Sequence, residues 1–258
     1  EADRPDRLVE HERRAPVGRG SDGVQTTPAN QTLSPHGVFV DLPGMRPQVL
    51  QPSADGRHLY VAGKTRELVG LDAAAGAVRQ RVPLPSGKGQ ASYTGLAVAA
   101  DGARVWLSNV EGAVEVFAVA EDGAVTGERA LPLPPADAPR RRAEIPAGLC
   151  ASADRRHLYV CGNLSNRLLE LDAATGDVVR GFDVGTAPFD VVLAAGRAFV
   201  SNQGGRRPAA GDLVGPAGRG TVVRVDPVRH IASEGSVSVL DLATGTLVRE
   251  TVTGLHAS

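Results

Sequence analysis

The sequence predicts an all-β fold built from four-stranded antiparallel sheets, and two recurring segments support this prediction. One is a turn sequence, found as LDAAAG at residues 71–76, LDAATG at 171–176, LDLATG at 240–245 and a degenerate FAVAEDG at 117–123. The other lies upstream of each turn and reads ADGRHLYVAG from residue 54, ADGARVWLSN from 100, ADRRHLYVCG from 153 and AAGRAFVSN from 194. The apolar runs between them are too short for helices and are bounded by Asp-Gly or Thr-Gly turn signals. Four copies of each segment therefore indicate four similar units.

Each unit is predicted to be a meander of four strands. In the first unit the strands span residues 48–51, 58–62, 67–71 and 77–84, and the four units span 45–85, 91–134, 143–185 and 186–254. Leu168, Leu169 and Leu171 would place apolar groups on both faces of one sheet, so both faces must be covered. Sheets stacked radially as blades meet that requirement, and the sequence therefore predicts a β-propeller. A parallel β-helix also repeats, but its turns are shorter and it lacks these hairpins.

The ends of the sequence predict an incomplete ring of blades. Residues 254–258, GLHAS, repeat GLCAS at 148–152 and are expected to begin a further blade. Residues 37–44 are expected to form an outer strand that would close the ring against a missing last blade, and residues 1–29 are expected to be a poorly ordered extension. We therefore expect four blades plus parts of others, with a closed ring of four as the alternative.

Composition argues against several classes of protein. The 28 Lys and Arg residues balance 29 Asp and Glu residues, and aromatic residues make up only 3%, so neither a basic footprint nor a base-stacking surface for nucleic acid is expected. No apolar run is long enough to span a bilayer. Cys150 and Cys161 fall on adjacent predicted strands, where we expect two buried thiols rather than a disulfide.

Four tetrapeptides carry a family resemblance: YVAG at residues 60–63, WLSN at 106–109, YVCG at 159–162 and FVSN at 199–202. They resemble the YVTN signature of the YVTN/YncE-type bacterial β-propellers. Five longer segments are similar to one subfamily, in which such a propeller precedes a phosphoesterase domain of the alkaline phosphatase superfamily: 30–35, 92–98, 162–172, 215–221 and 223–237. The resemblance implies an exported bacterial protein, periplasmic or extracellular and usually of seven blades, with metal-dependent hydrolysis in a following domain that these residues do not include.

The candidate functional site is a set of long loops on one face of the propeller. Residues 203–235 interrupt the fourth unit, and the long connections 86–93 and 134–145 should emerge on the same face, where propellers commonly bind partners. Residues 221–225, TVVRV, alternate well enough to add a short strand to the insertion. The candidate docking or ligand residues are Arg140, Arg141, Arg142, Arg206, Arg207, Arg219, Arg224, Asp226, Arg229 and His230.

Three interpretations of these arginines stay open. They could dock the following phosphoesterase domain, or hold a small anionic ligand, since Arg suits bidentate contact with carboxylate or phosphate. They could also form a solvated loop in which Asp212, Asp226 and Glu234 neutralise them. Asp226 and His230 could meet on one helical turn as metal ligands, but no third ligand lies nearby.

The remaining polar residues that recur are interpreted as structural. His58 and His157 share one repeat position, and Asn109 and Asn202 share another at a strand end. We therefore predict no catalytic residue, metal or cofactor within these residues. The expected function is a noncatalytic binding or scaffold module, and the alternative is a metal-dependent or lactonase-like propeller enzyme with its site at the channel mouth.

Overall fold

A computed structural model describes residues 16–21, 23–29, 31–34, 36–218 and 221–254, which belong to two compact units divided after Asp41. In the first unit β1 (Gly18–Arg19), β2 (Gln25–Thr26) and β3 (Thr32–Leu33) form a small antiparallel sheet. Arg19 pairs with Asp41 at 2.7 Å and lies over the ring of Phe39. The predicted poorly ordered extension covers residues 1–29, of which 1–15 and 22 lie outside the described residues.

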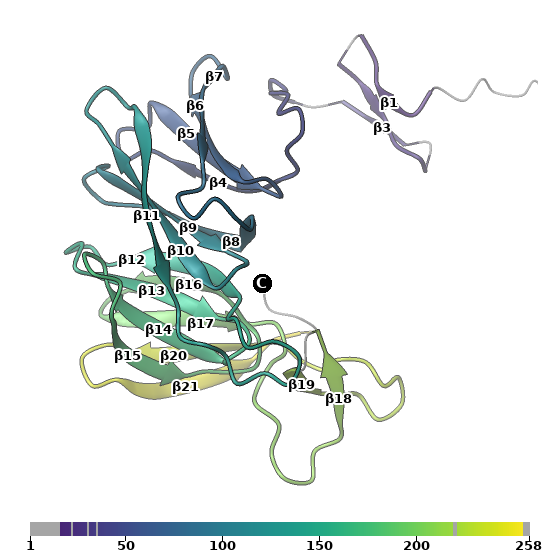
Figure 1. Ribbon diagram of the computed structural model, residues 1–258. Helices are drawn as coiled ribbons and strands as arrows, with labels where there is room; N and C mark the ends of the chain where they lie inside the picture. Colours follow the sequence, from purple (N-terminus) through teal and green to yellow (C-terminus); the bar gives the residue numbers. More distant parts are fainter. Residues whose placement is uncertain (1–15, 22, 30, 35, 219–220, 255–258) are drawn as a thin grey trace, which may run out of the picture. The chain divides into compact units, whose positions relative to one another are not determined.

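The second unit consists of four-stranded antiparallel sheets, so the predicted all-β fold class is confirmed (Figure 1). The first blade contains β4 (Pro47–Pro52), β5 (His58–Gly63), β6 (Glu67–Asp72) and β7 (Val78–Pro83). The second contains β8 (Ala91–Val98), β9 (Arg104–Asn109), β10 (Ala113–Val119) and β11 (Val125–Pro132). The third contains β12 (Pro146–Ala151), β13 (His157–Gly162), β14 (Arg167–Asp172) and β15 (Val178–Asp183). The fourth contains β16 (Pro188–Ala194), β17 (Arg197–Asn202), β20 (Ser236–Asp241) and β21 (Thr246–Val252). Among the described residues no helix is long and apolar enough to cross a membrane.

The recurring LDAAAG-type sequence forms the hairpin turn between the third and fourth strands of a blade. In the first blade the carboxylate of Asp72 accepts hydrogen bonds from the backbone N–H groups of Ala74 and Ala75, at 3.0 and 2.8 Å. Gly76 completes the turn with φ +64°, a conformation that favours glycine. Asp172 and Asp241 accept the same pair of hydrogen bonds in the third and fourth blades, which explains why this short sequence recurs.

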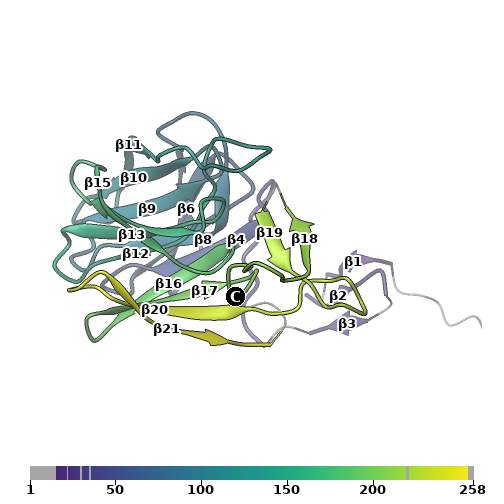
Figure 2. The same ribbon diagram turned by 90° about the horizontal axis from the view of Figure 1, so that it is seen from below.

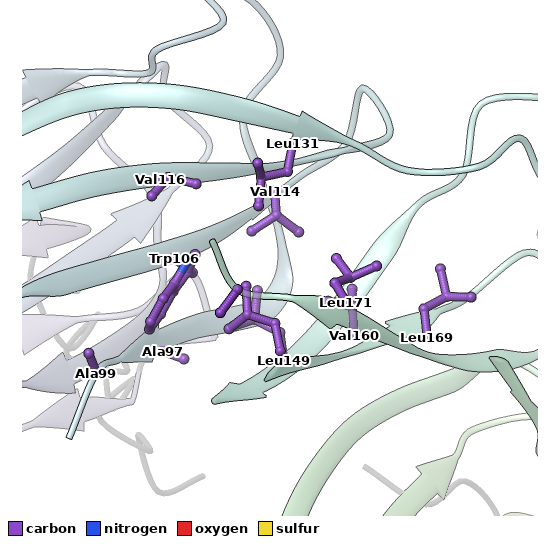
Figure 3. Close-up of a cluster of buried hydrophobic side chains, with 12 residues drawn as sticks. Ala97, Ala99, Trp106, Val114, Val116, Leu131, Leu149, Val160, Leu169 and Leu171 are labelled. Carbon is purple, nitrogen blue, oxygen red and sulfur yellow. The ribbon is translucent and has the colours of Figure 1, made fainter. Parts of the chain in front are cut away.

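In the first three blades the aromatic residue of the YVAG-type tetrapeptide packs against the following blade. Trp106 of the second blade is 1% exposed and lies in a cluster with Leu149, Val160, Leu169 and Leu171 of the third (Figure 3). Tyr60 packs in the same way against the second blade, and Tyr159 against the fourth. Apolar residues on both faces of a sheet are therefore explained by stacking, because each inner blade has a neighbour on either side.

The blades form an arc, and no closed ring is seen (Figures 1 and 2). Contacts between the innermost strands run from β4 to β8, from β8 to β12 and from β12 to β16. On the fourth blade Phe199 occupies the position of Trp106, and Val192 pairs with it across the sheet and is 59% exposed. The apolar interface side of the fourth blade is thus left partly open to solvent.

One local prediction differs from the structure, and another falls mostly on residues that the structure does not describe. Residues 37–44 form no strand, because a strand needs a neighbour for its hydrogen bonds and none pairs with this segment in the described part of the chain. Of the predicted further blade start at 254–258, residues 255–258 lie outside the described residues. Cys150 and Cys161 are free thiols on β12 and β13, of which Cys161 is buried as expected and Cys150 is only half-buried, and Cys150 lies opposite Tyr159 rather than Cys161.

Candidate functional site

The insertion at residues 203–235 leaves β17 and returns to β20 through a hairpin of its own. Its strands are β18 (Val214–Ala217) and β19 (Thr221–Arg224), so the additional strand predicted at 221–225 is present. Both ribbon views show this hairpin projecting beyond the sheet of the fourth blade (Figures 1 and 2). In its described residues the insertion therefore contains secondary structure of its own.

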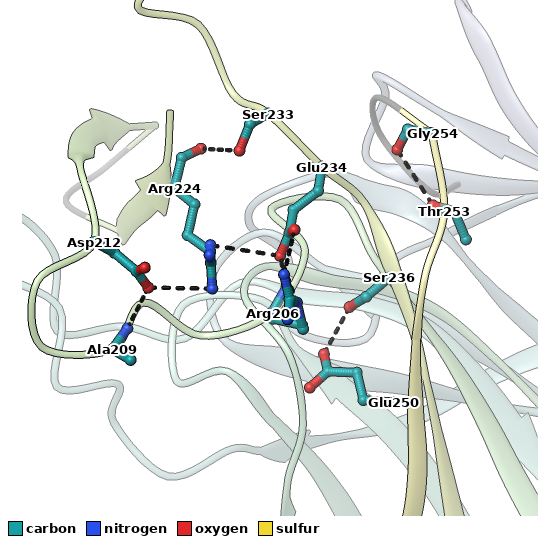
Figure 4. Close-up of polar contacts among 10 residues, drawn as sticks. All are labelled: Arg206, Ala209, Asp212, Arg224, Ser233, Glu234, Ser236, Glu250, Thr253 and Gly254. Carbon is teal, nitrogen blue, oxygen red and sulfur yellow. Dashed lines mark hydrogen bonds and ion pairs between the residues drawn. The ribbon is translucent and has the colours of Figure 1, made fainter. Parts of the chain in front are cut away.

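A buried carboxylate holds the two ends of the insertion together (Figure 4). Glu234, which is 8% exposed, accepts hydrogen bonds from Nε and Nη2 of Arg206, at 3.0 and 2.9 Å, and from the backbone N–H of Arg206 at 3.1 Å. These hydrogen bonds hold the pKa of the Glu234 carboxyl below its ordinary value. Gly205, with φ +72°, lies so close that an added Cβ would meet Cγ of Glu234 at 2.5 Å. Residues at the beginning and the end of the insertion thus form one clamp.

The hairpin is attached to the same clamp. Arg224 lies with Nε 3.8 Å from Oε1 of Glu234 and with Nη1 3.1 Å from Oδ2 of Asp212. The guanidinium groups of Arg206 and Arg224 therefore face carboxylates of their own loop. Bidentate and networked pairs of this kind fix geometry more effectively than isolated surface pairs.

Arg207 connects the insertion to the third blade. Its Nε donates to the carbonyl oxygen of Val184 at 2.7 Å, and its Nη2 donates to the carbonyl oxygen of Asn166 and to Oδ1 of Asp183. Two loops of the neighbouring blade thereby hold one side of the insertion.

The Asp226 turn does not present a metal site. The carboxylate of Asp226 accepts hydrogen bonds from the backbone N–H groups of Val228 and Arg229, at 2.9 and 2.7 Å, and pairs with the Arg229 guanidinium at 3.3 Å. His230 is exposed, with φ +54°. Nowhere in the described residues do three or more His, Cys, Asp or Glu side chains form a group that could hold a metal ion.

The connection at residues 133–145 lies on the same face and is held by a second buried carboxylate. Glu144, which is 1% exposed, accepts hydrogen bonds from the backbone N–H groups of Ile145, Leu164 and Ser165. Arg141 donates to the carbonyl oxygens of Ala143 and Val110. Arg140 and Arg142 are exposed, and their side chains form no ion pair with any described residue.

A cavity of about 370 Å³ separates this connection from the insertion. Residues 137–139 line one side, and Arg207, Pro208, Thr221 and Val222 line the other. The predicted convergence of these two long loops is therefore observed, although their arginines do not all point into one site. Arg219 lies outside the described residues.

The third long connection, predicted at residues 86–93, leads to the same face, where the side chain of Tyr93 lies in β8. Tyr93 packs with Ala136, Ile145 and Leu164, and its ring meets that of Phe189 edge to face with centroids 5.5 Å apart. The start of this loop is held by Glu115, a buried carboxylate that accepts hydrogen bonds from the backbone and side chain of Ser86.

The sequence reasoning missed the apolar character of the insertion surface. Five large aliphatic side chains of the insertion are exposed, and we call them the apolar patch: Leu213 47%, Val214 44%, Val222 46%, Val228 84% and Ile231 48%. The available signal was two large aliphatic residues, Val228 and Ile231, within the short polar segment DPVRHIAS. Exposed apolar residues beside arginines are typical of surfaces that bind proteins.

Comparisons with known proteins identify the fold alone. No family model and no curated protein sequence matches this chain. Among solved structures, hydrazine synthase of Kuenenia stuttgartiensis is similar, with a TM-score of 0.59 and 19% identity, over 86% of this chain and 53% of that one. The WD40 repeats of RRP9 are similar with a TM-score of 0.57, 12% identity and coverage of 83% and 53%. U3-55K is similar with a TM-score of 0.56, 11% identity and coverage of 83% and 54%.

These structures support a β-propeller fold for this chain. The chain spans about half the length of each of them. At such low identity the likeness carries no information about ligand or activity.

Proposed function

We propose that this chain is a noncatalytic β-propeller segment that binds a protein partner through the insertion and the neighbouring connection at residues 133–145. The observation that carries the proposal is the combination of a clamped base with an exposed apolar patch. Glu234, Arg206 and Arg207 fix the base of the insertion, while Val228 and Ile231 are exposed. A loop that is already ordered loses little conformational entropy on binding.

Charge and composition favour a protein over a small anion. Arg206 and Arg224 are neutralised by Glu234 and Asp212, so these guanidinium groups are not available to a free anion. Arg140 and Arg142, on the connection at residues 133–145, are exposed, and Arg with large apolar side chains is enriched at protein interfaces.

For the identity of the partner, we propose a phosphoesterase domain of the same polypeptide, in an exported bacterial protein. The support for this step is the resemblance of the repeats to the YVTN-type propellers that precede such a domain. The proposal predicts that the full reading frame continues into a domain with Asp and His metal ligands.

The test compares the product of the full reading frame with residues 1–258 alone, in assays of phosphodiester and phosphomonoester hydrolysis. We expect turnover only in the longer product, and we expect residues 1–258 to bind the separately produced hydrolase domain in a calorimetric titration. Turnover by residues 1–258 alone would contradict the noncatalytic assignment, and absence of binding would contradict the docking role.

A further inference from the structure

The first and third blades use the same residues at two positions and different residues at two others. The third blade carries His157, Tyr159, Glu170 and Arg180. The first blade carries His58, Tyr60, Gly70 and Gln80 at the corresponding positions. Across the sheet Tyr159 pairs with Glu170, as Tyr60 pairs with Gly70. Glu170 in turn pairs with Arg180, as Gly70 pairs with Gln80. The first blade therefore keeps the histidine and the tyrosine but lacks the carboxylate that lies between them.

In the third blade the carboxylate of Glu170 accepts hydrogen bonds from the side chains around it. Tyr159 Oη donates to Oε1 of Glu170 at 3.1 Å, and Arg180 Nε donates to Oε2 at 2.5 Å. His157 Nε2 lies 3.8 Å from Oε1. Glu170 is 2% exposed, so this site is a buried carboxylate with donors around it.

In the first blade the corresponding hydroxyl has no partner. Tyr60 is 1% exposed, and its Oη makes no hydrogen bond with any described residue. A buried hydroxyl without a partner is uncommon and destabilising. Tyr60 borders a cavity of about 360 Å³ that His58, Gly70 and Gln80 also line. The described residues thus place no hydrogen-bond acceptor beside the hydroxyl, where the third blade has its carboxylate.

The side chain of Gln80 forms hydrogen bonds with the second blade rather than with Tyr60. Its Nε2 donates to the carbonyl oxygen of Gly123 at 3.1 Å, and its Oε1 accepts from the backbone N–H of Val125 at 3.0 Å. Gln80 thus bridges to the second blade, as Arg180 bridges to the carbonyl oxygen of Leu242 in the fourth. It does not provide the missing acceptor for Tyr60.

Both arginines that line the cavity are already paired with carboxylates. Arg79 is paired with Asp72, and Arg57 is paired with Asp55. The carboxylate of Asp122 accepts the backbone N–H of Ala124. His58 is the remaining titratable side chain of the lining, and its ring lies against Gly123, where an added Cβ would meet Nε2 at 2.3 Å. An anion would thus meet the hydroxyl of Tyr60 and the imidazole of His58, and Asp122 is the one carboxylate of the lining that has no ion-pair partner among the described residues.

We propose that the cavity between the first and second blades binds a small carboxylate. One ligand oxygen accepts a hydrogen bond from Tyr60 Oη beside the imidazole of His58, as Glu170 does for Tyr159 in the third blade. This site is on the first blade and is independent of the docking role proposed for the insertion.

The test is a titration of residues 1–258 with sodium acetate, with sodium chloride as the control for ionic strength. Binding is followed through the NMR signals of the His58 imidazole and the Tyr60 backbone amide. We expect saturable shifts with acetate and none with chloride. Tyr60→Phe removes a hydrogen bond to a charged group, and we expect it to weaken binding about tenfold or more.

Two further variants separate this site from a general effect of acetate. Gly70→Glu combined with Gln80→Arg rebuilds the third-blade arrangement in the first blade and should abolish acetate binding. Tyr159→Phe removes the corresponding hydroxyl of the third blade and should leave acetate binding unchanged. An added Cβ at Gly70 would meet the side chain at position 80 at 3.1 Å, so the double variant requires a small structural shift. If the double variant does not fold, the acetate affinity of Tyr60→Phe alone tests the proposal. Absence of saturable shifts, or shifts that Tyr60→Phe leaves unchanged, would overturn the proposal and indicate a cavity filled by water.

Discussion

The blades and the insertion are held in place by different forces. In the blades, apolar side chains such as Trp106 are buried between neighbouring sheets, and polar residues cap the turns. In the insertion the polar side chains of Glu234 and Arg206 hold the base together, and the apolar side chains of Val228 and Ile231 are exposed. The comparison teaches that apolar groups in the blades are used for folding, whereas those of the insertion are available to a partner.

The largest expected effect is a loss of stability when the packing between blades is reduced. Trp106→Ala removes a side chain that is 1% exposed and leaves a cavity against the third blade. We expect the free energy of unfolding to fall by about 3–5 kcal/mol, measured by urea denaturation. Val179→Ala, at a position that is 51% exposed on β15, is the control and should change it by less than about 0.5 kcal/mol.

A smaller and local effect is expected when the clamp of the insertion is weakened. Glu234→Gln keeps the shape of the side chain but removes the charge that Arg206 and Arg224 face. We expect the opening free energy of residues 203–235 to fall by about 1–2 kcal/mol, seen as faster amide hydrogen exchange there and not in the blades.

Glu67→Gln is a matched control for this prediction, since it alters a more exposed pair with Arg81 in the first blade. Its effect on hydrogen exchange in the insertion should be absent. Equal acceleration throughout the chain in the Glu234 variant would show that the insertion is not a separate element held by this clamp.

The same clamp predicts a dependence on pH. The pKa of Glu234 is lowered in the folded state, chiefly by its hydrogen bonds with Arg206, so its contribution to stability is fully present above its ordinary pKa of about 4.3. That contribution is lost as the pH falls through the lower folded pKa. The opening free energy of residues 203–235, obtained from hydrogen exchange after correction for the intrinsic exchange rate at each pH, should therefore stay constant from pH 7 to about pH 5 and fall below that range, and the fall should be smaller in Glu234→Gln.

The blades could be predicted because their determinants are local and repeated. Asp72 caps a turn made by its own neighbours, and the same turn returns at Asp172 and Asp241. That Asp212, Asp226 and Glu234 neutralise the arginines of the insertion was one of the open interpretations, but the clamp itself could not be predicted, since Glu234 and Arg206 are far apart in sequence and meet only through the course of the insertion. The open interface side of the fourth blade was expected from the repeat, but the loop at residues 37–44 was not, because strand formation depends on a neighbour as well as on sequence.

The central claim is that the apolar patch of the insertion binds a protein partner, and the most direct measurement targets Val228 and Ile231. The double variant Val228→Asp with Ile231→Asp changes two exposed side chains and should leave the melting temperature unchanged. The calorimetric titration with the separately produced hydrolase domain should show binding at least about tenfold weaker than for the unaltered chain, while Val179→Asp should bind normally. Equal affinity of all three proteins for that domain would contradict the claim.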